Sequence, residues 1–156
     1  MYAHYQENEP GDVQYVFSSP ASSEEIAATE AAIGIRFPDD LRALFLQFRS
    51  LNCIWDSISI FPITEIPSSH QQLLGMASDD PPPTHALGPV SPLIHTCSRI
   101  PFAADNDRDI LVDLDPPVGG KVGQIVRLDM ECGEIEVIAE SLQAFLEHGL
   151  KRLKDQ

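Results

Sequence analysis

The sequence predicts a single α+β domain with a largely antiparallel sheet, two N-terminal helices and a closing C-terminal helix. Two observations support this. Segments with helical periodicity lie towards both ends of the chain, and alternating β segments separated by Gly and Pro follow one another between them. Consecutive strands joined by short turns pair antiparallel. The chain has 156 residues, 43% of them hydrophobic, which suits one domain with a substantial core.

Two helices are expected after residue 21. Ser22 and Glu25 have the spacing of a capping box, in which each side chain accepts a hydrogen bond from the other residue's backbone N–H. Gly34 stands where a left-handed residue ends a helix. Pro38 then starts a second helix with an apolar stripe, which predicts packing on the core. The stripe consists of Leu41, Leu44, Phe45 and Phe48.

The remaining elements follow from local patterns. The run 15–17 predicts an edge strand, residues 51–63 have β character, and a short helix is expected over 68–76. Residues 77–97 are rich in proline and predict a loop excursion. Ser141 caps a final helix with an apolar line of Leu142, Phe145, Leu146, Leu150 and Leu153. The chain thus divides into an N-terminal segment, 1–21, and a domain, 22–153.

The stretch 100–129 predicts a β-hairpin rich in acid. Ile110 and Val112 point to one face of its first strand, and Leu111 and Asp113 point to the other. Strands at 109–115, 122–129 and 134–139 form an antiparallel meander, because about six connecting residues cannot hold a crossover helix. Five aspartates and one asparagine crowd the entry and the tip of the hairpin: Asp105, Asn106, Asp107, Asp109, Asp113 and Asp115.

Composition narrows the class of partner. With 24 acidic and 10 basic side chains, the net charge is −14, which repels nucleic acid and favours a basic protein. No run approaches the ~18 apolar residues of a membrane span, so no membrane partner is expected. The N-terminus lacks the pattern of a signal peptide. Cys53, Cys97 and Cys132 are odd in number and widely spaced, which favours a reduced, cytoplasmic location.

The order of several motifs resembles a known family. The opening Ile26, Thr29-Glu30, Ile33-Gly34-Ile35 and Phe37-Pro38 is followed by Gly88-Pro89-Val90, Ile100-Pro101-Phe102, Leu114-Asp115-Pro116, Gly119-Gly120 and Gly123-Gln124-Ile125. This order is similar to that of the SUKH superfamily, which takes in the fungal Smi/Knr cell-wall-assembly regulators and many bacterial immunity proteins. The resemblance implies a binding module without catalysis or cofactor. In bacteria, it implies an antidote to a polymorphic toxin.

The leading hypothesis is therefore a cytosolic immunity protein that binds a basic toxin domain. We expect its contacts to include Asp105, Asp107 and Asp113, with Trp55 as an aromatic anchor or, alternatively, a core residue. A regulatory scaffold remains open, and the sequence does not set the oligomeric state.

A small metal-assisted hydrolase or transferase that uses the carboxylates from Asp105 to Asp115 is the enzymatic alternative. An EF-hand is disfavoured, because Ile110 and Pro116 occupy the positions that need Gly and Glu. The histidines have no metal-ligand spacing, and no G-x-S-x-G motif is present. The sequence therefore assigns no cofactor, no metal ligands and no catalytic residues, and it leaves open whether Asp105, Asp107 and Asp113 hold a cation.

Overall fold

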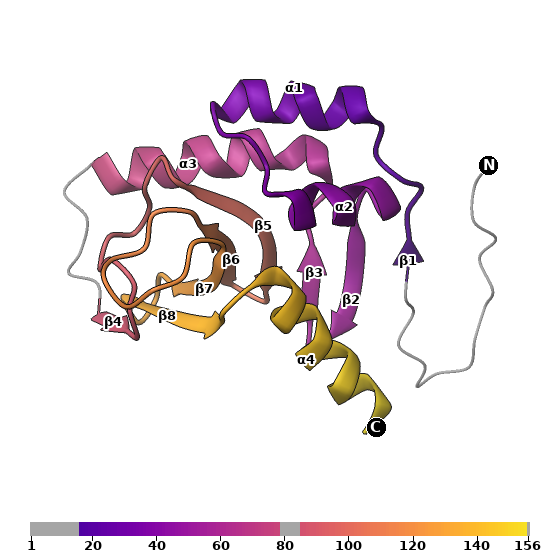
Figure 1. Ribbon diagram of the computed structural model, residues 1–156. Helices are drawn as coiled ribbons and strands as arrows, with labels where there is room; N and C mark the ends of the chain where they lie inside the picture. The colour runs from indigo at the N-terminus through magenta and orange to yellow at the C-terminus, as the bar shows by residue number, and fades with distance from the viewer. Residues whose placement is uncertain (1–15, 79–84, 156) are drawn as a thin grey trace.

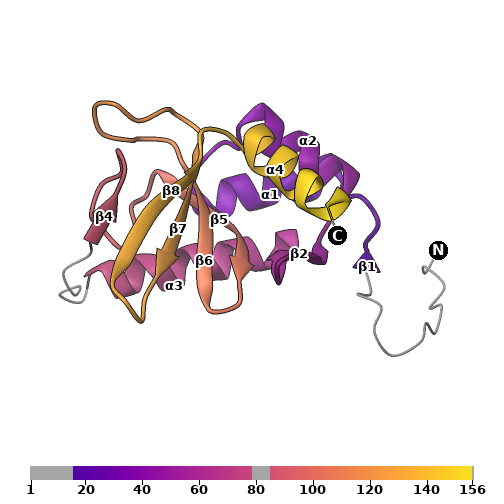
Figure 2. The same ribbon diagram turned by 90° about the horizontal axis from the view of Figure 1, so that it is seen from below.

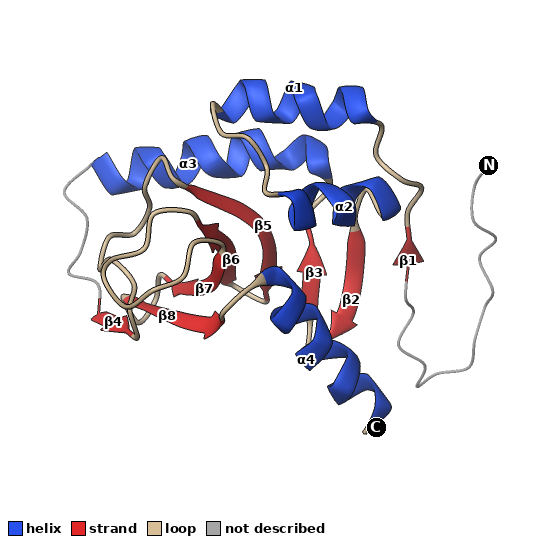
Figure 3. Ribbon diagram, in the orientation of Figure 1, coloured by secondary structure: helices blue, strands red, loops and turns tan. Residues whose placement is uncertain are grey.

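The computed structural model describes residues 16–78 and 85–155 and shows the predicted α+β fold (Figure 1). Most of the expected segment 1–21 lies outside these residues, as does Tyr15. Helices and short strands are interspersed along the first half of the chain, and consecutive strands followed by a final helix make up the second half (Figure 3). The elements are β1 Val16–Phe17, α1 Ser23–Ile33, α2 Asp39–Gln47, β2 Leu51–Trp55, β3 Ile58–Ile60, η1 Ile63–Glu65, α3 Ile66–Ser78, β4 His85–Leu87, β5 Arg99–Asp105, β6 Arg108–Asp113, β7 Gln124–Asp129, β8 Glu134–Ala139 and α4 Leu142–Lys154.

The helix ends follow the sequence signals. Ser22 Oγ accepts a hydrogen bond from the Glu25 N–H at 3.1 Å, and the Glu25 carboxylate accepts one from the Ser22 N–H at 2.9 Å. Gly34 ends α1 with φ 73°, a left-handed conformation that favours glycine. Ser141 Oγ caps α4 by accepting from the Ala144 N–H. The two serine caps satisfy backbone donors that the first turn of a helix leaves without a partner.

The strands form one sheet in the order β1-β2-β3-β5-β6-β7-β8-β4. The predicted meander is confirmed, because β6 pairs antiparallel with β7 and β7 antiparallel with β8. The edge strand expected near residue 16 is also present as β1. Within the proline-rich stretch 77–97, residues His85–Leu87 form the short strand β4, which pairs parallel with β8. Local sequence does not signal this strand, since its partner lies about fifty residues away.

Both faces of the central strands are covered. Ile110 and Val112 face a large core with side chains from α1, α2, α4 and the start of α3. Leu111 faces a second core, which Leu73 of α3 and the loop residues Val90 and Ile94 complete. Figure 2 shows α4, α2 and α1 on one side of β5–β8 and α3 on the other. Within the described ranges, none of the helices combines the length and apolar character needed to cross a membrane.

Three details differ from the sequence predictions. Helix α3 begins at Ile66 instead of residue 68, because Pro67 lies in its first turn, where a missing N–H costs nothing. Phe45 is fully buried, whereas Phe48 is only half-buried, since it ends α2 in an extended conformation. Leu150 of α4 is exposed. The face of α4 that packs on the core presents Gly149 to the ring of Trp55.

Candidate protein-binding surface

The acidic residues of the hairpin are divided between the two ends of strand β6. Asp105, Asn106 and Asp107 lie at the β5–β6 turn, whereas Asp113 and Asp115 lie where β6 runs into the loop 116–123. The six residues of β6, at about 3.3 Å each, place the two groups roughly 17–20 Å apart. The sequence pattern wrongly suggested one crowded cluster. We call the end of the sheet that carries the β5–β6 turn the turn end. The opposite end, where β6 runs into the loop 116–123, is the loop end.

Asp105 has intramolecular partners at the turn end. Its carboxylate is buried and lies 2.8 Å from Arg108 Nη2 and 3.4 Å from Arg127 Nη1. Arg127 also forms an ion pair with Glu136, so the charges link β5, β6, β7 and β8. Asp107 differs, because it is exposed at the tip of the turn, next to Asn106 with φ 52°. Of the two, only Asp107 presents its carboxylate to the solvent.

Asp107 belongs to a larger acidic surface, which the sequence analysis missed. The register of β6 with β7 places the β5–β6 turn beside the β7–β8 turn. The two turns and the strand residues that flank them include five carboxylates that form no ion pair with Lys or Arg in the described residues. We call this surface the acidic edge: Asp107, Asp109, Asp129, Glu131 and Glu134.

The field of the acidic edge affects the groups within it. The charge of Asp129 raises the pKa of the Cys132 thiol, with further contributions from desolvation and from Glu134 and Glu131. Burial raises the pKa of the half-buried Asp109. Clustered negative charge of this kind attracts cations and basic protein surfaces and raises their association rate. The signal in the sequence was the run of acids from Asp129 to Glu134, where two of the predicted strands meet.

At the loop end, Asp113 is buried in a polar network. Its carboxylate lies 3.6 Å from Arg99 Nε and accepts a hydrogen bond from Gln124 Nε2 at 3.1 Å. Gln124 Nε2 also donates to the Pro89 carbonyl at 2.9 Å. Arg99 donates to the carbonyls of Leu93 and Ser91 at 2.7 and 2.9 Å. The network therefore joins three strands to the loop 88–98.

Trp55 lies in the core rather than on the surface. Its ring packs against Phe145 of α4, with ring centroids 5.2 Å apart, and closely faces Gly149. Of the two roles expected for Trp55, the structure shows the core position. Partner binding by Asp105, Asp113 and Trp55 stays a prediction, and each of them has partners within the domain.

The structure separates the carboxylates that a metal-assisted enzyme would use together. Asp105 and Asp113 lie at opposite ends of β6, so they cannot share one small cation. Across residues 16–78 and 85–155, no group of three His, Cys, Asp or Glu side chains is arranged to hold a metal ion.

The fold does bring together two histidines that the sequence leaves 25 residues apart. His95 Nε2 lies 2.9 Å from His70 Nδ1, and both rings are buried. Burial, with the charges of His70 and Arg99, lowers the pKa of His95 from 6.5 to about 3, and burial also lowers the pKa of His70. Both imidazoles are therefore neutral at pH 7, and they join α3 to the loop 88–98.

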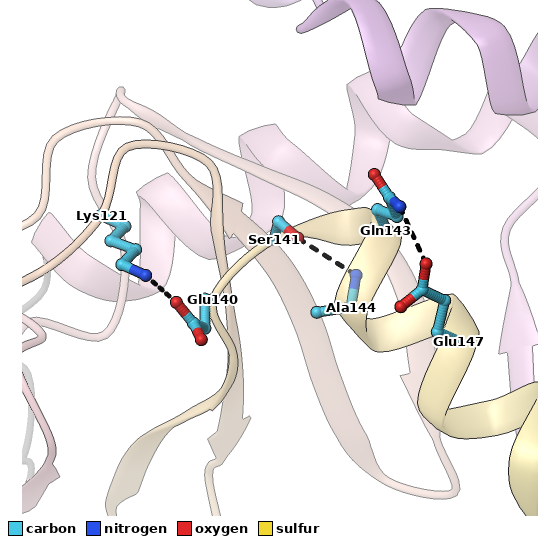
Figure 4. Close-up of a pocket in the computed structure, with 6 residues that line it drawn as sticks. All are labelled: Lys121, Glu140, Ser141, Gln143, Ala144 and Glu147. Atoms are coloured by element: carbon cyan, nitrogen blue, oxygen red, sulfur yellow. Dashed lines mark hydrogen bonds and ion pairs between the residues drawn. The ribbon is translucent and has the colours of Figure 1, made fainter.

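An open hollow of about 350 Å³ lies where the loop 116–123 approaches the start of α4 (Figure 4). Lys121 forms an ion pair with Glu140 across it, and Gln143 donates to Glu147 at 2.8 Å. The polar side chains in the hollow thus already have partners. The arrangement provides no nucleophile with an adjacent base, which acyl or phosphoryl transfer requires.

The fold and surface together define a class of protein: a small α+β domain with an open, largely antiparallel sheet and carboxylates gathered along one end of it. The chain belongs to the SMI1 / KNR4 family (SUKH-1), whose model matches residues 20–148. The match covers most of the chain and confirms the resemblance seen in the sequence. A comparison with curated proteins finds no match.

Proposed function

We propose that this protein is a non-enzymatic binding module that acts in the cytoplasm of a bacterium as an immunity protein and neutralises a basic toxin domain. Family membership supports a toxin-immunity or Smi/Knr-like role. The observation that carries the choice of a basic partner is the acidic edge, where five carboxylates form no ion pair with Lys or Arg in the described residues. Of the four residues predicted from sequence, Asp107 belongs to this surface.

The acidic edge is well suited to attract a partner quickly. Its two turns are held by the antiparallel pairing of β5 to β8 and by the ion pairs of Asp105 and Arg127, so little order has to be gained on binding. Fixed charge of one sign raises the association rate at low salt, and this effect weakens as salt screens the field.

The first experiment asks whether a toxin is the partner. The gene immediately upstream should encode a large toxin, and its C-terminal domain should copurify with this protein when both are expressed together. Coexpression should also restore growth that the toxin domain alone prevents. A neighbouring gene without a toxin, or a toxin domain that neither binds nor is neutralised, would contradict the immunity function. Binding to a non-toxin protein without neutralisation would point to the regulatory scaffold.

The second experiment tests the acidic edge with the same toxin domain. The double variant Asp107→Asn, Glu131→Gln should slow association about tenfold at low salt and leave dissociation nearly unchanged. The control is Glu24→Gln, Glu65→Gln, which removes the same charge from exposed positions on the helical side. Equal association rates for the two double variants would show that the acidic edge does not guide binding.

A further inference from the structure

Exposed apolar side chains gather on two loops at the loop end of the sheet. In the described residues, seven large apolar side chains are exposed, and three of them are scattered singly on α2, α3 and α4. The other four lie at the end of β4 and on the loops that follow β4 and β6, residues 87–93 and 116–123, which we call the loop pair: Leu87, Leu93, Val118 and Val122. Val118 is 104% exposed and Val122 is 75% exposed. Single exposed apolar residues are ordinary, whereas the two most exposed of these, Val118 and Val122, lie four positions apart on one short loop, which is typical of an interaction surface.

The two loops are joined at Pro89. Gln124, at the end of one loop, donates to the Pro89 carbonyl at 2.9 Å, and Gly120 packs so closely there that an added Cβ would lie 2.8 Å from the same oxygen. Arg99 holds the carbonyls of Ser91 and Leu93. Figure 2 shows the segment 116–123 extending past the strand ends, above β4. The apolar side chains are therefore presented on a backbone that is already ordered, which lowers the cost of binding.

The charges around the loop pair indicate what covers it. Asp115, Glu140 and Glu147 are the nearby acids and Lys121 is the nearby base, so the frame has a net charge of −2 (three carboxylates against one ammonium group). A second copy of the chain would bring another net −14 against this one, which opposes self-association. The complementary surface is an apolar recess with Lys or Arg at its rim.

We propose that the loop pair is the anchor of the interface: Val118 and Val122 insert into an apolar recess, rimmed by basic side chains, on the toxin domain. This rests on the proposed function and assigns its two steps to different surfaces. The acidic edge guides the encounter, and the loop pair holds the complex. Buried apolar anchors dominate the lifetime of a complex, because water must return to them before the partners separate.

The test is a kinetic comparison with the C-terminal domain of the toxin encoded immediately upstream. Val118→Ser, Val122→Ser should raise the dissociation rate about tenfold or more and leave the association rate unchanged. Leu46→Ser removes an exposed apolar side chain from α2 and is the control, with dissociation like that of the parent. Because Val118 and Val122 are exposed, thermal midpoints of parent and variants should agree.

A single charge at Val118 tests the basic rim. Val118→Arg should raise the dissociation rate more than Val118→Glu, since the rim repels the guanidinium. The reverse order, or dissociation of the double serine variant equal to that of Leu46→Ser, overturns the anchor while the proposed function stands. A parent protein that does not bind the toxin domain refutes the proposed function and the anchor together.

Discussion

The two ends of the sheet use aspartate in opposite ways. At the turn end, Asp107 faces the solvent, and across residues 16–78 and 85–155 neither it nor the rest of the acidic edge forms an ion pair with Lys or Arg. At the loop end, Asp113 is buried and holds Arg99 and Gln124 in place, and through them the loop pair. Asp107 and Asp113, six positions apart in the chain, thus differ in burial. The difference depends on whether neighbouring groups donate hydrogen bonds or carry positive charge that compensates for the loss of water around the carboxylate. A carboxylate without donors has to remain in water, and one with them can organise the interior.

The largest effect should come from removing the buried acid. Asp113→Ala leaves the Arg99 guanidinium buried without its counter-ion and should lower the free energy of unfolding by about 3–5 kcal/mol. Urea denaturation measures this loss. A loss below about 1 kcal/mol would mean that water enters the network and solvates Arg99, and the contrast between the two ends would then disappear.

The second-largest effect should come from acid, which is expected to lower the free energy of unfolding through the buried histidines at the loop end. The folded state lowers the pKa of His95 from 6.5 to about 3, so neutral His95 contributes stability that is complete above pH 6.5 and is lost as the pH falls towards 3. At pH 5 this costs about 2 kcal/mol, and His70 changes stability in the same direction.

The turn end responds in the opposite sense. The raised pKa of Asp109 favours the folded state as the pH falls, because the folded state then binds a proton more readily than the unfolded state. Denaturation midpoints between pH 7 and 5 measure the sum of the two opposing effects on stability. The variant His95→Asn should take up about one proton fewer on unfolding than the parent protein. A flat profile in the parent protein would contradict the buried neutral pair.

The loops of the loop pair pack closely at Gly120, and replacing this glycine should have a smaller effect on the free energy of unfolding. An added Cβ at Gly120 would lie 2.6 Å from Pro116 Cβ and 2.8 Å from the Pro89 carbonyl, so Gly120→Ala should cost about 1–3 kcal/mol. Gly75→Ala in α3 is the control, since its Cβ meets open space and alanine favours a helix, which should add up to about 1 kcal/mol. Thermal unfolding compares them. Equal midpoints for the two variants would show that the loops move apart easily.

The smallest effect is expected at the turn end. Asp107→Asn should change the free energy of unfolding by less than about 0.5 kcal/mol, because the side chain is exposed and forms no ion pair within the part of the chain that the structure describes. The same urea titration as for Asp113→Ala gives the comparison directly. A loss as large as that of Asp113→Ala would show that Asp107 has a structural partner and would remove it from the proposed binding surface.

Features that depend on neighbouring residues could be read from the sequence. The capping box of Ser22 and Glu25, the left-handed Gly34 and the cap of Ser141 involve groups within three residues or a single backbone angle. The meander of β6, β7 and β8 was also predictable, because short connections permit only antiparallel pairing. The family resemblance was recognisable for a related reason, since it rests on the order of such local motifs.

Tertiary structure decided which acids face solvent. Strand alternation correctly placed Asp113 opposite Ile110 and Val112, but alternation cannot show that a helix and a loop cover the second face as well. Similarly, the contact of His70 with His95, the pairing of β4 with β8 and the convergence of the two acidic turns join segments far apart in the chain. Such contacts depend on the packing of the whole domain, because burial is a property of the assembled layers and not of any one segment.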